Sequence, residues 1–208
     1  FLNYGVEAIL NTVESKGQTL NILTNQQTAA SSRYPDATWT SWAVYANYVV
    51  PISSRWKMQS ALRYNTNGIN ADFSNNLKFY PLPQLQLKDV YHSFTGNLGF
   101  VYQVDPSFSI SPQLSTGFRA HNVDDLGKFF DSQPKTVLVP NPNLGPEYAY
   151  NTELNLNKIL FGKIKLDLTG FYTWLDRAMV RRPSSWNGQT ELQYGGEISQ
   201  IFSIQNAA

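Results

Sequence analysis

The sequence predicts an all-β protein whose antiparallel strands belong to a transmembrane β-barrel. Polar and apolar side chains alternate along about seven segments, as they do on strands with one wet face and one apolar face. The connections between these segments alternate between short and long, which is typical of outer-membrane barrels. Aromatic residues gather at the segment ends, and amphipathic rings favour membrane interfaces. We expect about seven to eight strands, the last of them weakly marked after Thr190.

The composition excludes several other classes of protein. Of 208 residues, 15% are charged and 14% are aromatic, and the formal net charge is +1. Few charges and many rings argue against disorder, and a nearly neutral chain lacks the attraction for phosphate on which nucleic-acid binders depend. Without cysteine there is no disulfide scaffold, CxxC zinc site or thiol nucleophile. The chain begins at Phe1 without a signal peptide, so we expect a mature form or a piece of a longer protein.

The alternation sets the expected strands in chain order. They are Leu2–Leu10, Trp39–Val49, Arg55–Asn65, Tyr91–Val104, Ser107–Ala120, Glu147–Asn157 and a segment from Lys163 onward. In the fifth strand, Leu114 is expected to face lipid and Ser115 the lumen. Pro112 lies in the same strand and cannot donate to a ladder, so we expect it just above the short turn or at a bulge.

The connections define the expected orientation in the membrane. Short turns would face the periplasm and long loops the exterior. The short ones lie near Val50–Ser54, Val104–Ser107 and Lys158–Gly162, and the long ones near Glu14–Ala37, Thr66–Lys88, Ala120–Gly145 and Arg177–Gln189. A soluble β-sheet module that binds carbohydrate or another ligand through exposed Trp and Tyr remains an alternative. A small outer-membrane barrel that acts as an enzyme or adhesin is a third hypothesis.

Two motifs lie around the third long connection: GFRAHNVDDLGK begins at Gly117, and VLVPNPNLGPEYAYNTELNLN begins at Val137. They resemble the TonB-dependent receptor family of the outer membrane, in the form seen in Bacteroidetes-type bacteria. The matching positions are Gly117, Phe118, Arg119, Ala120, Asn122, Asn141, Pro142, Leu144, Pro146, Glu147, Asn151, Glu153 and Leu154. His121 stands where the family usually has proline, and Gly145 stands where it usually has lysine.

The resemblance implies a 22-stranded barrel around an N-terminal plug domain. Residues 1–208 would then be a partial β-barrel domain, with the plug domain absent from this chain, and Gln205, Asn206 and Ala207 resemble the start of a later strand. The implied function is uptake of a scarce nutrient such as an iron-siderophore, haem or cobalamin across the bacterial outer membrane, without enzymatic activity. The implied partners are outer-membrane lipid, the plug domain, the remaining barrel strands, the inner-membrane TonB complex acting through the plug, a small-molecule ligand of unknown identity and, as a further candidate, a surface lipoprotein.

Five residues are candidate ligand-facing loop positions: Tyr80, His92, His121, Asp124 and Asp125. Carboxylates near His121 could suit a metal, but their spacing does not repeat and Asp is a common turn former, so no metal and no cofactor is expected. No nucleophile elbow, zinc-protease motif or P-loop is present, and no catalytic residue is expected.

Two further expectations concern local contacts. Strand parity places Arg119, Glu147 and Glu153 on the lumenal side, so Arg119 is expected to pair with one of the two carboxylates. The alternative is that these charges are solvated and make no contact with one another. Asn187–Gly188 predicts a hairpin turn in the last long loop.

Overall fold

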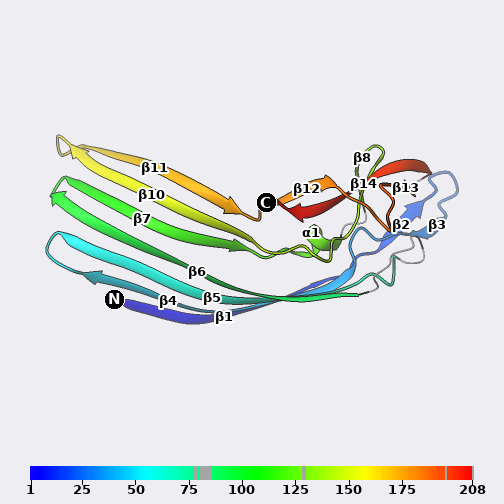
Figure 1. Cartoon of the computed structure of the whole chain (residues 1–208), viewed down its shortest axis with the longest axis horizontal. Helices are drawn as coiled ribbons and strands as arrows, with labels where there is room; N and C mark the ends of the chain where they lie inside the picture. Colours follow the sequence, from blue (N-terminus) through cyan, green and yellow to red (C-terminus); the bar gives the residue numbers. More distant parts are fainter. Residues whose placement is uncertain (77–78, 80–85, 128–129, 195, 208) are drawn as a thin grey trace.

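A computed structural model describes residues 1–76, 79, 86–127, 130–194 and 196–207 (Figure 1). Seven antiparallel strands form its main sheet, and their order in the sheet follows the chain, β1-β4-β5-β6-β7-β10-β11. The strands are β1 (Leu2–Val13), β4 (Asp36–Pro51), β5 (Trp56–Asp72), β6 (Gln86–Asp105), β7 (Phe108–Arg119), β10 (Glu147–Leu160) and β11 (Ile164–Asp176). The predicted fold class is therefore confirmed, with one strand of this sheet for each predicted segment.

Shorter elements occupy the long connections. A two-stranded sheet pairs β2 (Gly17–Leu20) with β3 (Gln27–Ala30). A five-stranded sheet has the order β12-β14-β9-β8, with β13 paired to β14. Its strands are β8 (Phe130–Gln133), β9 (Thr136–Leu138), β12 (Met179–Pro183), β13 (Glu191–Tyr194) and β14 (Glu197–Asn206), and the helix α1 (Val123–Gly127) precedes β8. The sequence predicted loops here, apart from the last strand, because three- to five-residue strands show too little alternation to be recognised.

The short and long connections lie at opposite ends of the main sheet, as predicted. Figure 1 shows the turns β4–β5, β6–β7 and β10–β11 together at one end and the small sheets at the other. The β10–β11 turn illustrates the tight kind: Phe161 and Gly162 both have positive φ, and the Lys163 amide donates to the Leu160 carbonyl at 3.0 Å. Among the described residues, no helix is long and apolar enough to cross a membrane.

The two faces of the main sheet differ as the alternation predicts. Register joins residues of equal parity across the sheet, as the row Leu98, Leu114 and Thr152 shows. Curvature crowds the side chains on the concave face and spreads those on the convex face. Ser93 on the concave face is accordingly 2% exposed, whereas Phe94 beside it is 74% exposed. Leu114 lies on the convex face and Ser115 on the concave face.

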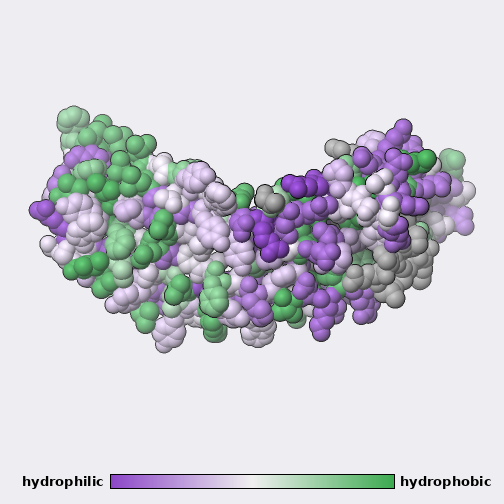
Figure 2. Space-filling model, viewed as in Figure 1, coloured by the Kyte–Doolittle hydropathy of each residue, from purple (hydrophilic) through white to green (hydrophobic). Residues whose placement is uncertain are grey.

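The convex face is apolar over the half that carries the short turns. Exposed side chains there include Val6, Trp42, Val44, Leu62, Phe94, Leu114, Leu168 and Trp174. Figure 2 shows hydrophobic residues gathered toward this half and hydrophilic ones over the half with the small sheets. Such an arrangement suits a sheet with hydrocarbon around one half and water around the other. Phe171 and Leu175 are exceptions, because they are exposed apolar residues on the concave parity of β11.

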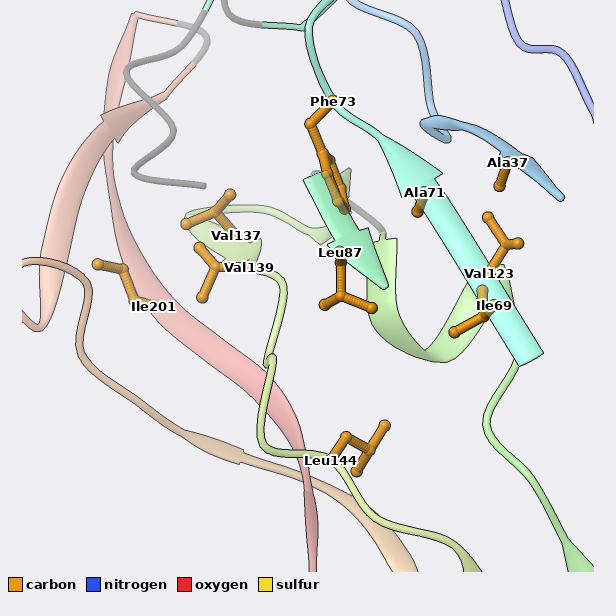
Figure 3. Packing of buried hydrophobic residues seen from close by; sticks show 10 residues of the cluster. All are labelled: Ala37, Ile69, Ala71, Phe73, Leu87, Val123, Val137, Val139, Leu144 and Ile201. Carbon is orange, nitrogen blue, oxygen red and sulfur yellow. The ribbon is translucent and has the colours of Figure 1, made fainter. Parts of the chain in front are cut away.

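The buried core lies at the long-loop end rather than beneath the membrane half. It joins the ends of β5 and β6 to α1, β9 and β14, as Figure 3 shows. Its members are Ala37, Ile69, Ala71, Phe73, Leu87, Val123, Val137, Val139, Leu144 and Ile201. Because the long loops are in water, they need this core to stay folded. Strands β5 and β6 reach into it, which makes them 17 and 20 residues long and longer than predicted.

Pro112 lies early in β7, opposite Leu154 of β10. On the other side of β7, the register with β6 skips from Gly99↔Gln113 to Tyr102↔Ile110. Pro112 has no backbone N–H to donate, and it lies where the pairing of β6 with β7 is interrupted. The pairing of β7 with β10 continues past it. Its place near the short turn agrees with one of the two expected positions. The register shift in this pair lies between Gln103 and Asp105, away from Pro112.

The β6–β7 register ends at Asn97↔Ser115, although both strands continue beyond it. At the next position the Gly96 amide donates to Thr116 Oγ1 at 2.9 Å, so a side chain replaces the backbone partner. A glycine is needed at position 96 because an added Cβ would lie 2.5 Å from the Ala61 carbonyl oxygen. Towards the long loops, β6 stays with β5 while β7 stays with β10.

Candidate functional site at the mouth of the wall

A pocket of about 520 Å³ lies where the concave face meets the long loops. Its lining comes from β1, β4 and the segment after β7, which lie far apart in the strand order. Only the concave face of a curved sheet can bring these strands around one space. The side chains that define it, hereafter the mouth pocket, are Asn11, Tyr34, Trp39, Arg119, Asn122 and Asp124. Two aromatic rings, one guanidinium and one carboxylate can therefore contact a ligand together.

The residues after β7 are held by a capping box at the start of α1. The Asp125 amide donates to Asn122 Oδ1 at 3.0 Å, and the Asn122 amide donates to Asp125 Oδ2 at 3.1 Å. These reciprocal bonds satisfy amides that a helix start leaves unpaired. Arg119 Nη2 also donates to both oxygens of Asp125, at 2.8 and 2.9 Å. The motif residues Arg119 and Asn122 thus position α1 beside the wall.

Tyr34 joins the loop before β4 to α1 at the rim of the mouth pocket. Its hydroxyl donates to Asp124 Oδ1 at 2.8 Å. This hydrogen bond to the carboxylate, assisted by burial, raises the pKa of Tyr34, so the phenol stays protonated and keeps donating. Asp124 therefore contacts Tyr34 and also lines the pocket. Asp124 and Asp125 were both predicted to lie in a loop, but they lie in the first turn of α1.

His121 is buried, with 1% exposure, and does not face the pocket opening. Its ring meets the Tyr91 ring edge-on at 4.3 Å between centroids. Burial lowers the pKa of His121 to about 4, although Asp89 and Asp125 favour the charged form. Neither ring nitrogen has a hydrogen-bond partner among the described residues. The side chain therefore serves as a neutral packing group, so the prediction that it is ligand-facing is wrong.

The second motif joins the main sheet to the small sheet. Asn141 Nδ2 donates to the Ile204 carbonyl at 2.8 Å, and the Gly145 amide donates to Asn206 Oδ1 at 2.7 Å. Leu144 between them is buried in the core, and Pro146 precedes the start of β10 at Glu147. The Arg177 guanidinium lies against Gly145 and would have to move if a side chain were added there.

The predicted partner of Arg119 is wrong. Arg119 and Glu147 are opposed in register, as parity requires. However, Arg119 contacts Asp125, whereas Glu147 Oε2 accepts from the Met179 amide at 2.7 Å and so holds the start of β12. Glu153 lies farther down the concave row, opposite Gln113. Asn151 Oδ1 accepts from Thr173 Oγ1 at 2.8 Å and links β10 to β11.

The remaining candidates are not brought together. His92 lies within β6 rather than in a loop and has the parity of the convex face. Its Nδ1 is 2.9 Å from Tyr64 Oη and 3.0 Å from Thr66 Oγ1. Tyr80 lies outside the described residues. Within the part of the chain that the structure describes, no three His, Asp or Glu side chains are grouped to hold a metal ion.

Sequence reasoning missed the aromatic half of the mouth pocket. Trp39 begins a predicted strand, and rings at strand ends are expected at the membrane interface, but its parity matches Ser41 and Arg63, and it lines the pocket. That parity was the available signal. Tyr34 lies outside any strand, where alternation gives no direction, and its contact with Asp124 spans 90 residues.

A curved antiparallel sheet with an apolar convex band, a polar concave face and loops at one end defines the wall of an outer-membrane β-barrel. The sequence matches the family model described as TonB dependent receptor-like, beta-barrel, over residues 3–207. The chain therefore belongs to the TonB-dependent receptor family, and barrels of this family lie in the bacterial outer membrane. A comparison with curated proteins found no match.

Solved structures agree with this fold. The copper transporter OprC superposes with a TM-score of 0.72 at 13% identity, over 99% of this chain and 30% of that one. A double mutant of the Serratia marcescens hemophore receptor HasR, in complex with HasA and haem, gives 0.73 at 13%, over 99% and 34%. The ferric-catecholate import receptor Fiu from E. coli K12 gives 0.63 at 12%, over 96% and 30%. The chain thus spans about a third of the length of these structures.

Proposed function

We propose that this chain supplies part of the wall and outer loops of a receptor that takes up a scarce nutrient complex. An iron-siderophore, haem or cobalamin is the expected ligand class, and transport rather than catalysis is the expected role. The observation that carries the proposal is the mouth pocket, which combines Trp39, Tyr34 and Arg119 on the concave side of a membrane wall. Rings contact planar or aromatic groups, and a guanidinium suits carboxylate or catecholate oxygens.

The wall needs further strands to function in a membrane. β1 and β11 are the two edge strands of the seven-stranded sheet. Each strand is antiparallel to its neighbour, so the first and the seventh strands run in the same direction. Closing the sheet on itself would pair them in parallel, which outer-membrane barrels avoid. An unpaired edge in hydrocarbon costs several kcal/mol per unsatisfied group. We therefore assign residues 1–208 to a partial barrel domain that other strands complete around a plug domain.

The expected partners follow from this assignment. The convex band contacts outer-membrane lipid, the concave face contacts the plug, and the TonB complex of the inner membrane acts through the plug. A surface lipoprotein could associate with the outer loops. A soluble carbohydrate-binding module is the weaker hypothesis, because Leu62, Phe94 and Trp174 would then be exposed to water on one continuous face.

The test uses the full receptor, purified in detergent and also assayed for uptake in cells. Trp39→Ala is expected to weaken binding of the transported complex at least tenfold, because the ring lines the mouth pocket. Trp42→Ala is the matched control, since it lies three residues away in β4 but on the convex face at 61% exposure. Equal binding by both variants would remove the mouth pocket from the proposal.

A further inference from the structure

A second pocket lies in the long-loop half of the molecule, and none of its described lining residues belongs to the mouth pocket. Its volume is about 300 Å³, at the lower end of the range for small-molecule sites. Phe73, Leu87 and Val139 form an apolar base, and Figure 3 shows these three side chains near one another within the core. Because all three are at most 4% exposed, the base belongs to the folded core and is not a loose surface depression.

Trp186 forms one wall of this second pocket and is held by its own hairpin. Asn187 and Gly188 both have positive φ, at 49° and 79°, which is the geometry of the predicted two-residue turn. The Trp186 amide donates to the Gln189 carbonyl at 2.7 Å, and the Gln189 amide donates back at 2.9 Å. The indole also packs against the core. Its ring is therefore fixed before any ligand arrives.

Small polar groups stand beside this apolar surface. The Ser184 amide donates to the Ile201 carbonyl at 2.9 Å, which fixes the backbone, while its hydroxyl makes no hydrogen bond with the described residues. Ser203 is 3% exposed, and its Oγ accepts from Gln205 Nε2 at 3.0 Å, so its own proton remains available. Asn143, which carries a side-chain amide, also lines the pocket. Donors and acceptors thus surround one aromatic wall.

The described residues that line the second pocket carry no charged side chain. These described side chains would supply no counter-charge to a charged ligand that loses its hydration on entering the pocket. We propose that the second pocket binds a small neutral hydroxylated molecule, such as one sugar ring. The apolar face of the ring would lie on Trp186, and its hydroxyls would exchange hydrogen bonds with Ser184, Ser203 and Asn143.

This binding is independent of the proposed uptake. The probes are glucose, galactose and N-acetylglucosamine, with glucuronate and glucose 6-phosphate as charged counterparts. They are titrated into the purified full receptor by calorimetry and by protein-observed NMR. At least one neutral sugar is expected to bind with a dissociation constant on the order of 1 mM, a plausible affinity for one small ring. The charged sugars are expected to bind at least tenfold more weakly.

Trp186→Ala is expected to weaken neutral-sugar binding at least tenfold, and Trp186→Phe to recover much of it because a ring remains. Trp174→Ala on the convex face is the matched control and is expected to bind like the parent. Folding of each variant is checked by its heat-resistant migration on gels. Absence of binding by every neutral sugar, equal binding of charged sugars, or full binding by folded Trp186→Ala would overturn the proposal.

Discussion

Replacing Leu114 by arginine tests which face of the wall meets lipid. Leu114 is six residues beyond Phe108, the first residue of β7 after the short turn. At about 3.4 Å per residue this is about 20 Å along the strand, and a tilt of about 45° reduces it to about 14 Å of height. That places Leu114 near the middle of an apolar band about 25 Å tall. Its side chain is 56% exposed on the convex face.

An arginine at this depth is expected to cost about 2–4 kcal/mol. Ser115→Arg places the same charge one residue away on the concave side, where water and polar neighbours surround it, so its cost should be small. The assay is urea-induced unfolding of the full receptor in lipid vesicles, with folding monitored by tryptophan fluorescence and by gel migration. Greater destabilisation by Ser115→Arg than by Leu114→Arg would refute the assignment of the two faces.

Two further predictions concern the segment after β7. Asn122→Ala removes one side of the capping box and should destabilise α1 by about 1 kcal/mol, seen as about fivefold faster amide exchange over 123–127; unchanged exchange would contradict the helix-capping role. His121 has a pKa of about 4 when folded, against 6.5 for the ordinary side chain, so the folded state binds fewer protons between these values. The contribution of neutral His121 to the free energy of unfolding is therefore complete above pH 6.5 and is lost as the pH falls toward 4. In thermal melts, His121→Leu should reduce the pH dependence of stability between pH 6.5 and 4, whereas the control His92→Gln should leave it unchanged. An unchanged pH dependence in His121→Leu would contradict the assignment of this effect to buried His121.

The main sheet could be predicted from the sequence because its cause is local. Each residue meets either lipid or water according to parity, so Leu114 and Ser115 carry the signal themselves. The same signal weakens where both faces meet water. Above Gly68 the alternation in β5 reverses its phase, because Ile69 and Ala71 are buried apolar residues on the parity that is polar lower in the strand. The upper parts of β5 and β6 were therefore expected to be loops.

The site was harder to predict because its contacts join distant segments. Arg119 and Glu147 were placed correctly in register, but a helix turn brings Asp125 closer to the guanidinium than the carboxylate opposite it. His121 carried no sign in the sequence that it would be buried, since Tyr91, which covers it, is 30 residues away on another strand. Parity tells on which side a side chain lies but not which neighbour it meets.

The substitution of a threonine hydroxyl for a backbone partner beside Gly96 divides the wall into two panels. One panel, β1-β4-β5-β6, carries the β2–β3 hairpin, and the other, β7-β10-β11, carries α1 and the small sheet. Above the boundary, the panels are joined by contacts such as Tyr91 with His121 instead of by ladder hydrogen bonds. The Tyr34–Asp124 hydrogen bond and the shared buried core also cross this boundary. Side chains, rather than paired backbones, therefore hold hairpin and helix together at the mouth of the wall.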